Sequence, residues 1–145
     1  CTIQGAHVLV IGAGRIGFLL AVRLHALGAQ VTVAARSLRD RARIESAGLA
    51  AVDTAQLAQE VHGREIIFNT VPAPLLTGEI LRALTPSCIV IDLASMPGGV
   101  APDADPPTGC RVIHALSLPG KVAPRTAAAA IYATVTAILR EEGVL

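Results

Sequence analysis

Short apolar runs alternate along this chain with longer stretches in which apolar residues recur at helical spacing. Six runs are too short for helices and rich in β-branched residues, so each predicts a strand buried on both faces. The predicted strands are His7–Ile11, Gln30–Ala35, Leu49–Val52, Glu65–Asn69, Cys88–Asp92 and Arg111–Ala115. Strands that alternate with helices predict an α/β fold, here a three-layer Rossmann fold whose six-stranded, parallel, doubly wound sheet has the order 3-2-1-4-5-6.

Capping residues mark where the intervening helices begin. Ser37 and Asp40 form an S-x-x-D pattern before one helix, and Asp53 with Gln56 forms a capping box before the next. The helices are predicted over residues 18–27, 38–47, 54–61 and 77–84, and from Pro124 to about Glu142, with 116–123 as a loop. The apolar faces expected to be buried are Ile16, Leu20, Leu24 and Leu27 on the first helix, and Ala127, Ile131, Val135 and Ile138 on the last.

Three glycines with the spacing G-x-G-x-x-G follow the first strand directly. Gly12 permits the tight turn, Gly14 has no Cβ to obstruct a pyrophosphate, and Gly17 lets the helix pack closely on the sheet. The free amides of Arg15 and Ile16, in the first turn of the helix, would face the phosphates. In this strand–turn–helix context the glycine pattern predicts a dinucleotide-binding site.

The tip of the second strand bears on which dinucleotide binds. NAD-specific domains usually carry Asp or Glu there for the ribose 2′-hydroxyl. This chain instead has Arg36 and Ser37, followed by Arg39, Arg41 and Arg43. Guanidinium groups pair bidentately with phosphate, and a serine hydroxyl can donate to it, so the tip favours NADP over NAD, with Arg36, Ser37 and Arg39 as ligands of the 2′-phosphate. The alternative is that Ser37 only caps the helix and the arginines form a solvated face.

The loops after the fourth and fifth strands are expected at the carboxyl edge of the sheet, where ligands bind in such folds. Asn69 and Thr70 would meet the nicotinamide ribose or, as the alternative, form an ordinary turn. Asp92 is expected to accept hydrogen bonds from loop amides. The segment 93–99 is rich in glycine and small residues, so that its backbone can approach a flat ring.

Three residues are candidates for chemistry on the substrate side. Lys121 would bind a substrate carboxylate, and its alternative is a surface lysine. His114 would act as acid or base near neutral pH, and its alternative is a packed or solvated histidine. Ser95 would donate to a carboxylate, or else cap its loop. Of these, Lys121 and His114 are the catalytic candidates.

Composition excludes several other functions. A net charge of +1 gives no broad field for nucleic acid or anionic membranes, and only one Tyr and two Phe are present for base stacking. The apolar stretch between Arg125 and Arg140 is too short to span a bilayer. Three irregularly spaced cysteines match neither a disulfide framework nor a zinc site, so we expect no metal and a reducing, cytoplasmic location.

Several motifs go beyond a general Rossmann pattern. They are VLVIGAGRIG (8–17), VTVAARS (31–37), NTVPAPLLT (69–77), IDLASMPGG (91–99) and LPGKVAPRTA (118–127). Together they closely resemble the C-terminal domain of the dipicolinate synthase A family, over nearly the whole chain. Two segments depart from that family, His114–Ser117 and the proline-interrupted stretch after Gly99, and both lie near the presumed substrate side.

The resemblance implies an NADP-linked oxidoreductase of endospore-forming bacteria that dehydrogenates a dihydrodipicolinate-derived substrate to dipicolinate. It also implies a partner, the separate, flavoprotein-like dipicolinate synthase B. By position it implies that pyrophosphate is held by Gly12, Gly14, Arg15, Ile16 and Gly17. The 2′-phosphate would be held by Arg36 and Ser37. The nicotinamide ribose would be bordered by Thr70, Val71, Pro72 and Ala94.

Two other functions remain open. The cofactor domain of a D-2-hydroxyacid dehydrogenase shares G-x-G-R-I-G, but the loop at 93–99 has no arginine to hold a substrate carboxylate. A non-catalytic dinucleotide-sensing domain would favour an acidic residue where Arg36 stands. Residues 1–145 are expected to be one dinucleotide-binding domain. For an enzyme, this domain would be part of a longer protein whose substrate domain lies upstream, and it would be inactive without that domain. Homo-oligomerisation stays open.

Overall fold

The computed structural model describes residues 2–102 and 104–141 of the chain. The chain divides into two compact units, Cys1–Ala115 and Leu116–Leu145, which are described separately. The first unit holds the strands β1 (His7–Ile11), β2 (Gln30–Ala34), β3 (Ala50–Val52), β4 (Ile66–Asn69), β5 (Ile89–Asp92) and β6 (Arg111–His114). Its helices are α1 (Arg15–Ala26), α2 (Leu38–Ser46), the 3₁₀ helix η1 (Thr54–Gln56), α3 (Leu57–Glu60) and α4 (Gly78–Arg82).

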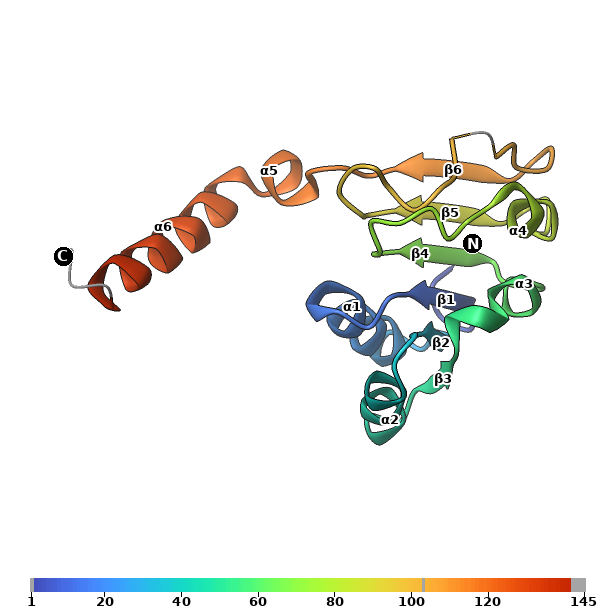
Figure 1. Ribbon diagram of the computed structural model, residues 1–145, viewed down its shortest axis with the longest axis horizontal. Helices are drawn as coiled ribbons and strands as arrows, with labels where there is room; N and C mark the ends of the chain where they lie inside the picture. The colour runs from blue at the N-terminus through green and yellow to red at the C-terminus, as the bar shows by residue number, and fades with distance from the viewer. Residues whose placement is uncertain (1, 103, 142–145) are drawn as a thin grey trace. The chain divides into compact units, whose positions relative to one another are not determined.

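The six strands form one sheet in the order β3-β2-β1-β4-β5-β6 (Figure 1). Every pairing is parallel, and the register brings Ile11, Asn69, Asp92 and His114 into one row at the carboxyl ends of β1, β4, β5 and β6. The predicted α/β fold and strand order are confirmed, with strand ends that move by one residue at most. The reversal of strand order lies between β1 and β4, which is where ligands bind in doubly wound sheets.

A separate apolar core covers each face of the sheet. Alternate residues of β1 face opposite sides, as the two-residue period of a strand requires. Val8 and Val10 pack with residues of α1 and α2, whereas Leu9 and Ile11 pack with residues of α3 and α4. The helices therefore lie two on each face, and the fold has the three layers that the sequence predicts.

The buried face of α1 differs from the predicted one. Ile16 and Leu27 are 66% and 59% exposed, and the buried residues of the helix are Gly17, Ala21 and Leu24. Small side chains let the helix axis approach the sheet, so the large residues that flank this stripe face outward. Predicting the stripe from size and hydrophobicity was therefore wrong for two of its four members.

The second unit contains α5 (Leu118–Val122) and α6 (Pro124–Glu141). A helix at α5 contradicts the predicted loop, because a proline is tolerated in the first turn, where its missing amide costs no intrahelical bond. Within the second unit no described residue of α6 is buried, and the expectation that Ile131 and Val135 face a core stays a prediction. The predicted end near Glu142 lies outside the described residues. Among the described helices, none has the length and apolar character needed to cross a bilayer.

Candidate functional site

The glycine-rich turn connects β1 to α1 at the carboxyl edge of the sheet. Gly12 has a φ of +104°, a left-handed conformation that favours glycine, and its amide donates to the Ala34 carbonyl at 2.9 Å. A Cβ added at Gly17 would lie 2.1 Å from the Gly12 carbonyl oxygen and 2.9 Å from Thr70 Oγ1. The structural reasons predicted for Gly12 and Gly17 are confirmed, and the helix starts directly against the turn.

The start of α1 is open to a ligand. Gly14 is its N-cap, with no side-chain capping bond and no acidic residue in the first turn. Within the described chain, the amides of Arg15 and Ile16 have no hydrogen-bond acceptor. A cavity of about 310 Å³ lies over them, lined by residues 12–17 and by Thr70, Val71 and Pro72. Unsatisfied helix amides in such a cavity suit an anionic group.

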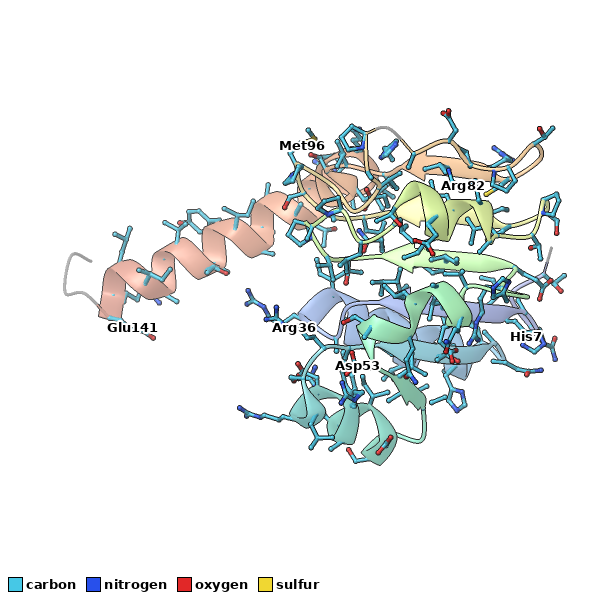
Figure 2. The ribbon with its side chains drawn as sticks, turned by 45° about the vertical axis from the view of Figure 1, so that its right-hand side comes forward. His7, Arg36, Asp53, Arg82, Met96 and Glu141 are labelled. Carbon is cyan, nitrogen blue, oxygen red and sulfur yellow. The ribbon has the colours of Figure 1, made fainter. Side chains whose placement is uncertain are left out.

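A second cavity of about 360 Å³ lies beside the first, over the ends of β1 and β2. The two cavities share Gly12, Ala13 and Val71 in their walls. The remaining wall of the second cavity consists of Ala34, Ala35, Arg36, Ser37, Asp40, Thr54, Ala73 and Leu75. One continuous groove therefore runs from the tip of β2 across the glycine turn, and Figure 2 shows Arg36 at this edge and His7 at the opposite one.

The four arginines after β2 have different roles. Arg41 donates to the carbonyls of Ala35 and Arg36, each at 2.9 Å, and pairs with Asp53 at 2.5 Å. The Ala55 amide has the largest effect and lowers the pKa of Asp53; desolvation opposes it, and Arg41 lowers the pKa further. Arg43 is also bound within the protein. Arg36 and Arg39 are exposed, and no residue in the described part of the chain pairs with either guanidinium.

Ser37 caps α2, as its alternative interpretation predicts. Its Oγ accepts from the Asp40 amide at 3.0 Å and donates to Asp40 Oδ2 at 2.7 Å, so this proton is directed to a carboxylate within the protein. Asp40 also lies 3.8 Å from the Arg43 guanidinium through Oδ1. The charge pattern of the sequence does not predict a carboxylate in this groove, although the S-x-x-D spacing sets Asp40 one helical turn from Ser37.

Polar side chains meet at the ends of β4, β5 and β6. Asp92 is fully buried and accepts hydrogen bonds from Asn69 Nδ2 at 2.8 Å, the Ala94 amide at 3.2 Å and the Gly99 amide at 2.9 Å. His114 Nδ1 lies 3.6 Å from Asp92 Oδ2, with a side chain 58% exposed. The expectation that Asp92 binds loop amides is confirmed, and a solvent-accessible imidazole lies beside this carboxylate at the carboxyl edge.

The small residues after β5 have an internal reason. A Cβ at Gly99 would lie 1.8 Å from Asn69 Nδ2, and one at Gly98 would lie 2.9 Å from Asp92 Oδ2. Asn69 also forms a turn with Val71, bonding to its carbonyl at 2.9 Å and its amide at 3.2 Å. Close packing on Asn69 and Asp92 therefore requires glycine here whether or not a ring approaches.

The remaining predicted residues are dispersed. Thr70 Oγ1 donates to the Ile11 carbonyl at 2.9 Å while lining the first cavity. Ala94 is 3% exposed and lines neither cavity of the groove, and Ser95 is exposed in the loop after β5. Lys121 is exposed on α5 of the second unit, and its substrate role stays a prediction.

Comparison with known proteins agrees with this architecture. Residues 1–141 match the family model of the alanine dehydrogenase/PNT C-terminal domain. Dipicolinate synthase A of Bacillus subtilis (strain 168) is 39% identical over 140 residues, which are 97% of this chain and 47% of that protein. The crystal structure of dipicolinate synthase A from Bacillus subtilis has a TM-score of 0.92 at 38% identity, over 97% of this chain and 47% of that one. A transhydrogenase structure from Sinorhizobium meliloti has a TM-score of 0.79 at 25% identity, over 97% of this chain and 45% of that one.

The match extends over nearly all of this chain and about half of each relative. The resemblance to dipicolinate synthase A that the motifs indicate is confirmed. The sheet order, the open glycine turn and the groove across it agree with the family match. The chain belongs to the alanine dehydrogenase/PNT C-terminal domain family, a family of Rossmann-fold oxidoreductase domains.

Proposed function

We propose that the chain is the NADP-binding domain of an oxidoreductase of the dipicolinate synthase A type. The observation that carries the proposal is the continuous groove from Arg36 to the free amides at the start of α1. The substrate would be a dihydrodipicolinate-derived dicarboxylate that is dehydrogenated to dipicolinate. The bound dinucleotide supplies a hydride acceptor for this reaction.

The residues of the groove fit such a cofactor. Arg15 and Ile16 would hold the pyrophosphate through their amides, with Gly12, Gly14 and Gly17 giving the backbone room for it. The second cavity would hold the adenosine between the glycine turn and the tip of β2. The nicotinamide end would lie toward Thr70, Val71 and Pro72, with Ala94 as a further neighbour.

The preference for NADP rests on the charges at the tip of β2. Arg36 is exposed and has no partner among the described residues, so its guanidinium is available for a 2′-phosphate. The carboxylate of Asp40 would repel that phosphate, but both of its oxygens have partners within the protein. Ser37 donates to Oδ2, and the Arg43 guanidinium lies 3.8 Å from Oδ1. Ser37 would contribute mainly by capping α2, with Arg39 adding positive charge.

Proton transfer and substrate binding would involve residues at the carboxyl ends of β5 and β6 and in the segments that follow them. His114 beside Asp92 is the candidate base for the proton that leaves with the hydride. Ser95 and Lys121 would bind the substrate carboxylates. We place the enzyme in the cytoplasm of a spore-forming bacterium, with dipicolinate synthase B as its partner. We expect the isolated domain to bind the dinucleotide but turn over poorly without its substrate domain.

Calorimetric titration of the chain with NADPH and NADH tests the proposal. We expect NADPH to bind more tightly, and Arg36→Ala to weaken NADPH by about tenfold while leaving NADH nearly unchanged, because one charge-assisted pair is lost. Arg82→Ala on α4 is the control for loss of a surface arginine, since it lines neither cavity. NADH binding tenfold more tightly than NADPH would overturn the NADP assignment.

A further inference from the structure

Arg43 connects α2 to the glycine turn. Its Nη2 donates to the Ala13 carbonyl, thirty residues earlier in the chain, and its guanidinium lies 4.6 Å from the centre of the Phe18 ring on α1. The same group lies 3.8 Å from Asp40. One side chain therefore contacts the turn, the helix after it and the carboxylate that accepts from the α2 cap.

The turn needs such a contact at Ala13. Gly12 and Gly17 pack against Thr70 and against each other, but a Cβ at Gly14 would meet nothing within 4 Å. Ala13 packs in the core, but packing does not confine Gly14, so the peptide between them is held by packing at one end only. Because a peptide unit is planar and trans, fixing the Ala13 carbonyl also fixes the direction of the Gly14 amide.

We propose that Arg43 is a positioning residue for dinucleotide binding, which sets the plane of the Ala13–Gly14 peptide and so the approach to the free amides of α1. The proposal rests on the function proposed above. Arg43 is absent from the walls of both cavities, so it acts through the turn rather than on the ligand. It differs in this from Arg36, which lines the cavity and faces the 2′-phosphate position.

Substitution of Arg43 and substitution of Arg36 should have opposite effects on the affinities for two fragments of the cofactor. ADP-ribose contains the pyrophosphate but no 2′-phosphate, so Arg43→Met should weaken its binding by about tenfold. 2′-AMP contains the 2′-phosphate but no pyrophosphate, so the same variant should weaken its binding by no more than about threefold, because Asp40 loses only its exposed ion pair with Arg43 at 3.8 Å. Arg36→Met should show the reverse pattern, and NADPH should lose affinity in both variants.

Calorimetry with these three ligands on the full chain tests the inference. Arg43→Lys, which keeps a cationic donor, should recover most of the ADP-ribose affinity, and Arg82→Met on α4 should match the wild type. The Gly14 amide resonance should move in Arg43→Met without ligand and return toward its original position in Arg43→Lys. If Arg43→Met does not fold, Arg43→Gln replaces it. This variant retains an N–H donor, so we expect its affinity for ADP-ribose to lie between those of the wild type and of a variant without a donor.

Three results would overturn the inference. In the first, ADP-ribose binds to the Arg43 variants as to the wild type. In the second, 2′-AMP and ADP-ribose weaken together, which indicates a general loss of structure or a direct role in the adenosine site. In the third, the wild type binds none of the three ligands, and the proposed function itself then fails, a result distinct from the other two.

Discussion

Alanine substitutions at two glycines of the same turn should have different effects: one should lower the stability of the fold, and the other should weaken cofactor binding. Gly14 and Gly17 lie three residues apart, yet an added methyl group meets different surroundings at each. At Gly17 it would lie 2.1 Å from the Gly12 carbonyl oxygen, which is backbone and cannot rotate away. At Gly14 it would meet no atom within 4 Å, and the backbone there, with φ −65° and ψ −175°, is allowed for alanine.

The expected energies follow from these contacts. Gly17→Ala must push α1 away from the turn by about an ångström, an overpacking cost of about 3 kcal/mol, offset by about 1 kcal/mol of better helix propensity. A net loss of about 2 kcal/mol lowers Tm by about 7 °C in a chain of this length. Gly14→Ala loses about 0.5–1 kcal/mol as an N-cap but gains a similar amount from the less flexible unfolded chain, so its Tm should change little.

The binding effects should be reversed. The Cβ of Gly14→Ala projects into the space that the pyrophosphate needs, so affinity for NADPH should fall by at least about tenfold in a protein of unchanged Tm. Thermal unfolding without ligand, followed by calorimetric titration well below Tm, measures both quantities. Equal Tm values for Gly17→Ala and the wild type would refute the packing argument. Unchanged NADPH affinity in Gly14→Ala would refute the assignment of the turn as the pyrophosphate site.

Three further predictions concern buried or charged side chains. Asp92→Ala should lower the urea midpoint by the equivalent of about 2–4 kcal/mol, because Asn69 and two loop amides lose their acceptor, whereas exposed Asp105→Ala should be neutral. The pKa of Asp53 is lowered from 3.8, chiefly by the Ala55 amide, so its stabilising effect is complete above that value and lost as pH falls through the lower folded-state pKa. Urea unfolding of Asp53→Asn and wild type between about pH 7 and pH 2.5 should therefore converge at low pH. Burial raises the pKa of the Cys88 thiol to about 12, so peptide mapping at about pH 8 should find it alkylated only in the unfolded chain, and native-state alkylation would contradict its burial.

The sheet could be predicted because its signals are local. Each strand is a short apolar run, and its bounding glycines, prolines and caps stand within a few residues of it. Doubly wound topology then leaves little freedom, since parallel strands joined by helices must cross over with one hand. The row that contains Asn69 and Asp92 could be predicted in part, because polar residues at the ends of neighbouring apolar strands meet at one edge of the sheet.

The helical faces were harder to predict because burial depends on distance as well as hydrophobicity. On α1 the surface against the sheet consists of Gly17, Ala21 and Leu24, and close approach leaves Ile16 outside. A prediction that expects the largest apolar residues to be buried therefore selects the wrong face of such a helix as the buried one. On α6 the periodicity of Ile131 and Val135 indicates an apolar face but not what lies against it.

The charges of the groove could not have been assigned from spacing alone. Four arginines follow β2 at intervals of two or three residues, and the sequence alone does not distinguish which of them could bind a phosphate. Their roles diverge through contacts with distant segments, Arg41 with Asp53 and Arg43 with Ala13. Arg36 and Arg39 are exposed without a partner among the described residues, and Ser37 and Arg43 contact the carboxylate of Asp40. We therefore expect cofactor preference to depend on which arginines the fold leaves unpaired, and the spacing of residues in the sequence does not specify those contacts.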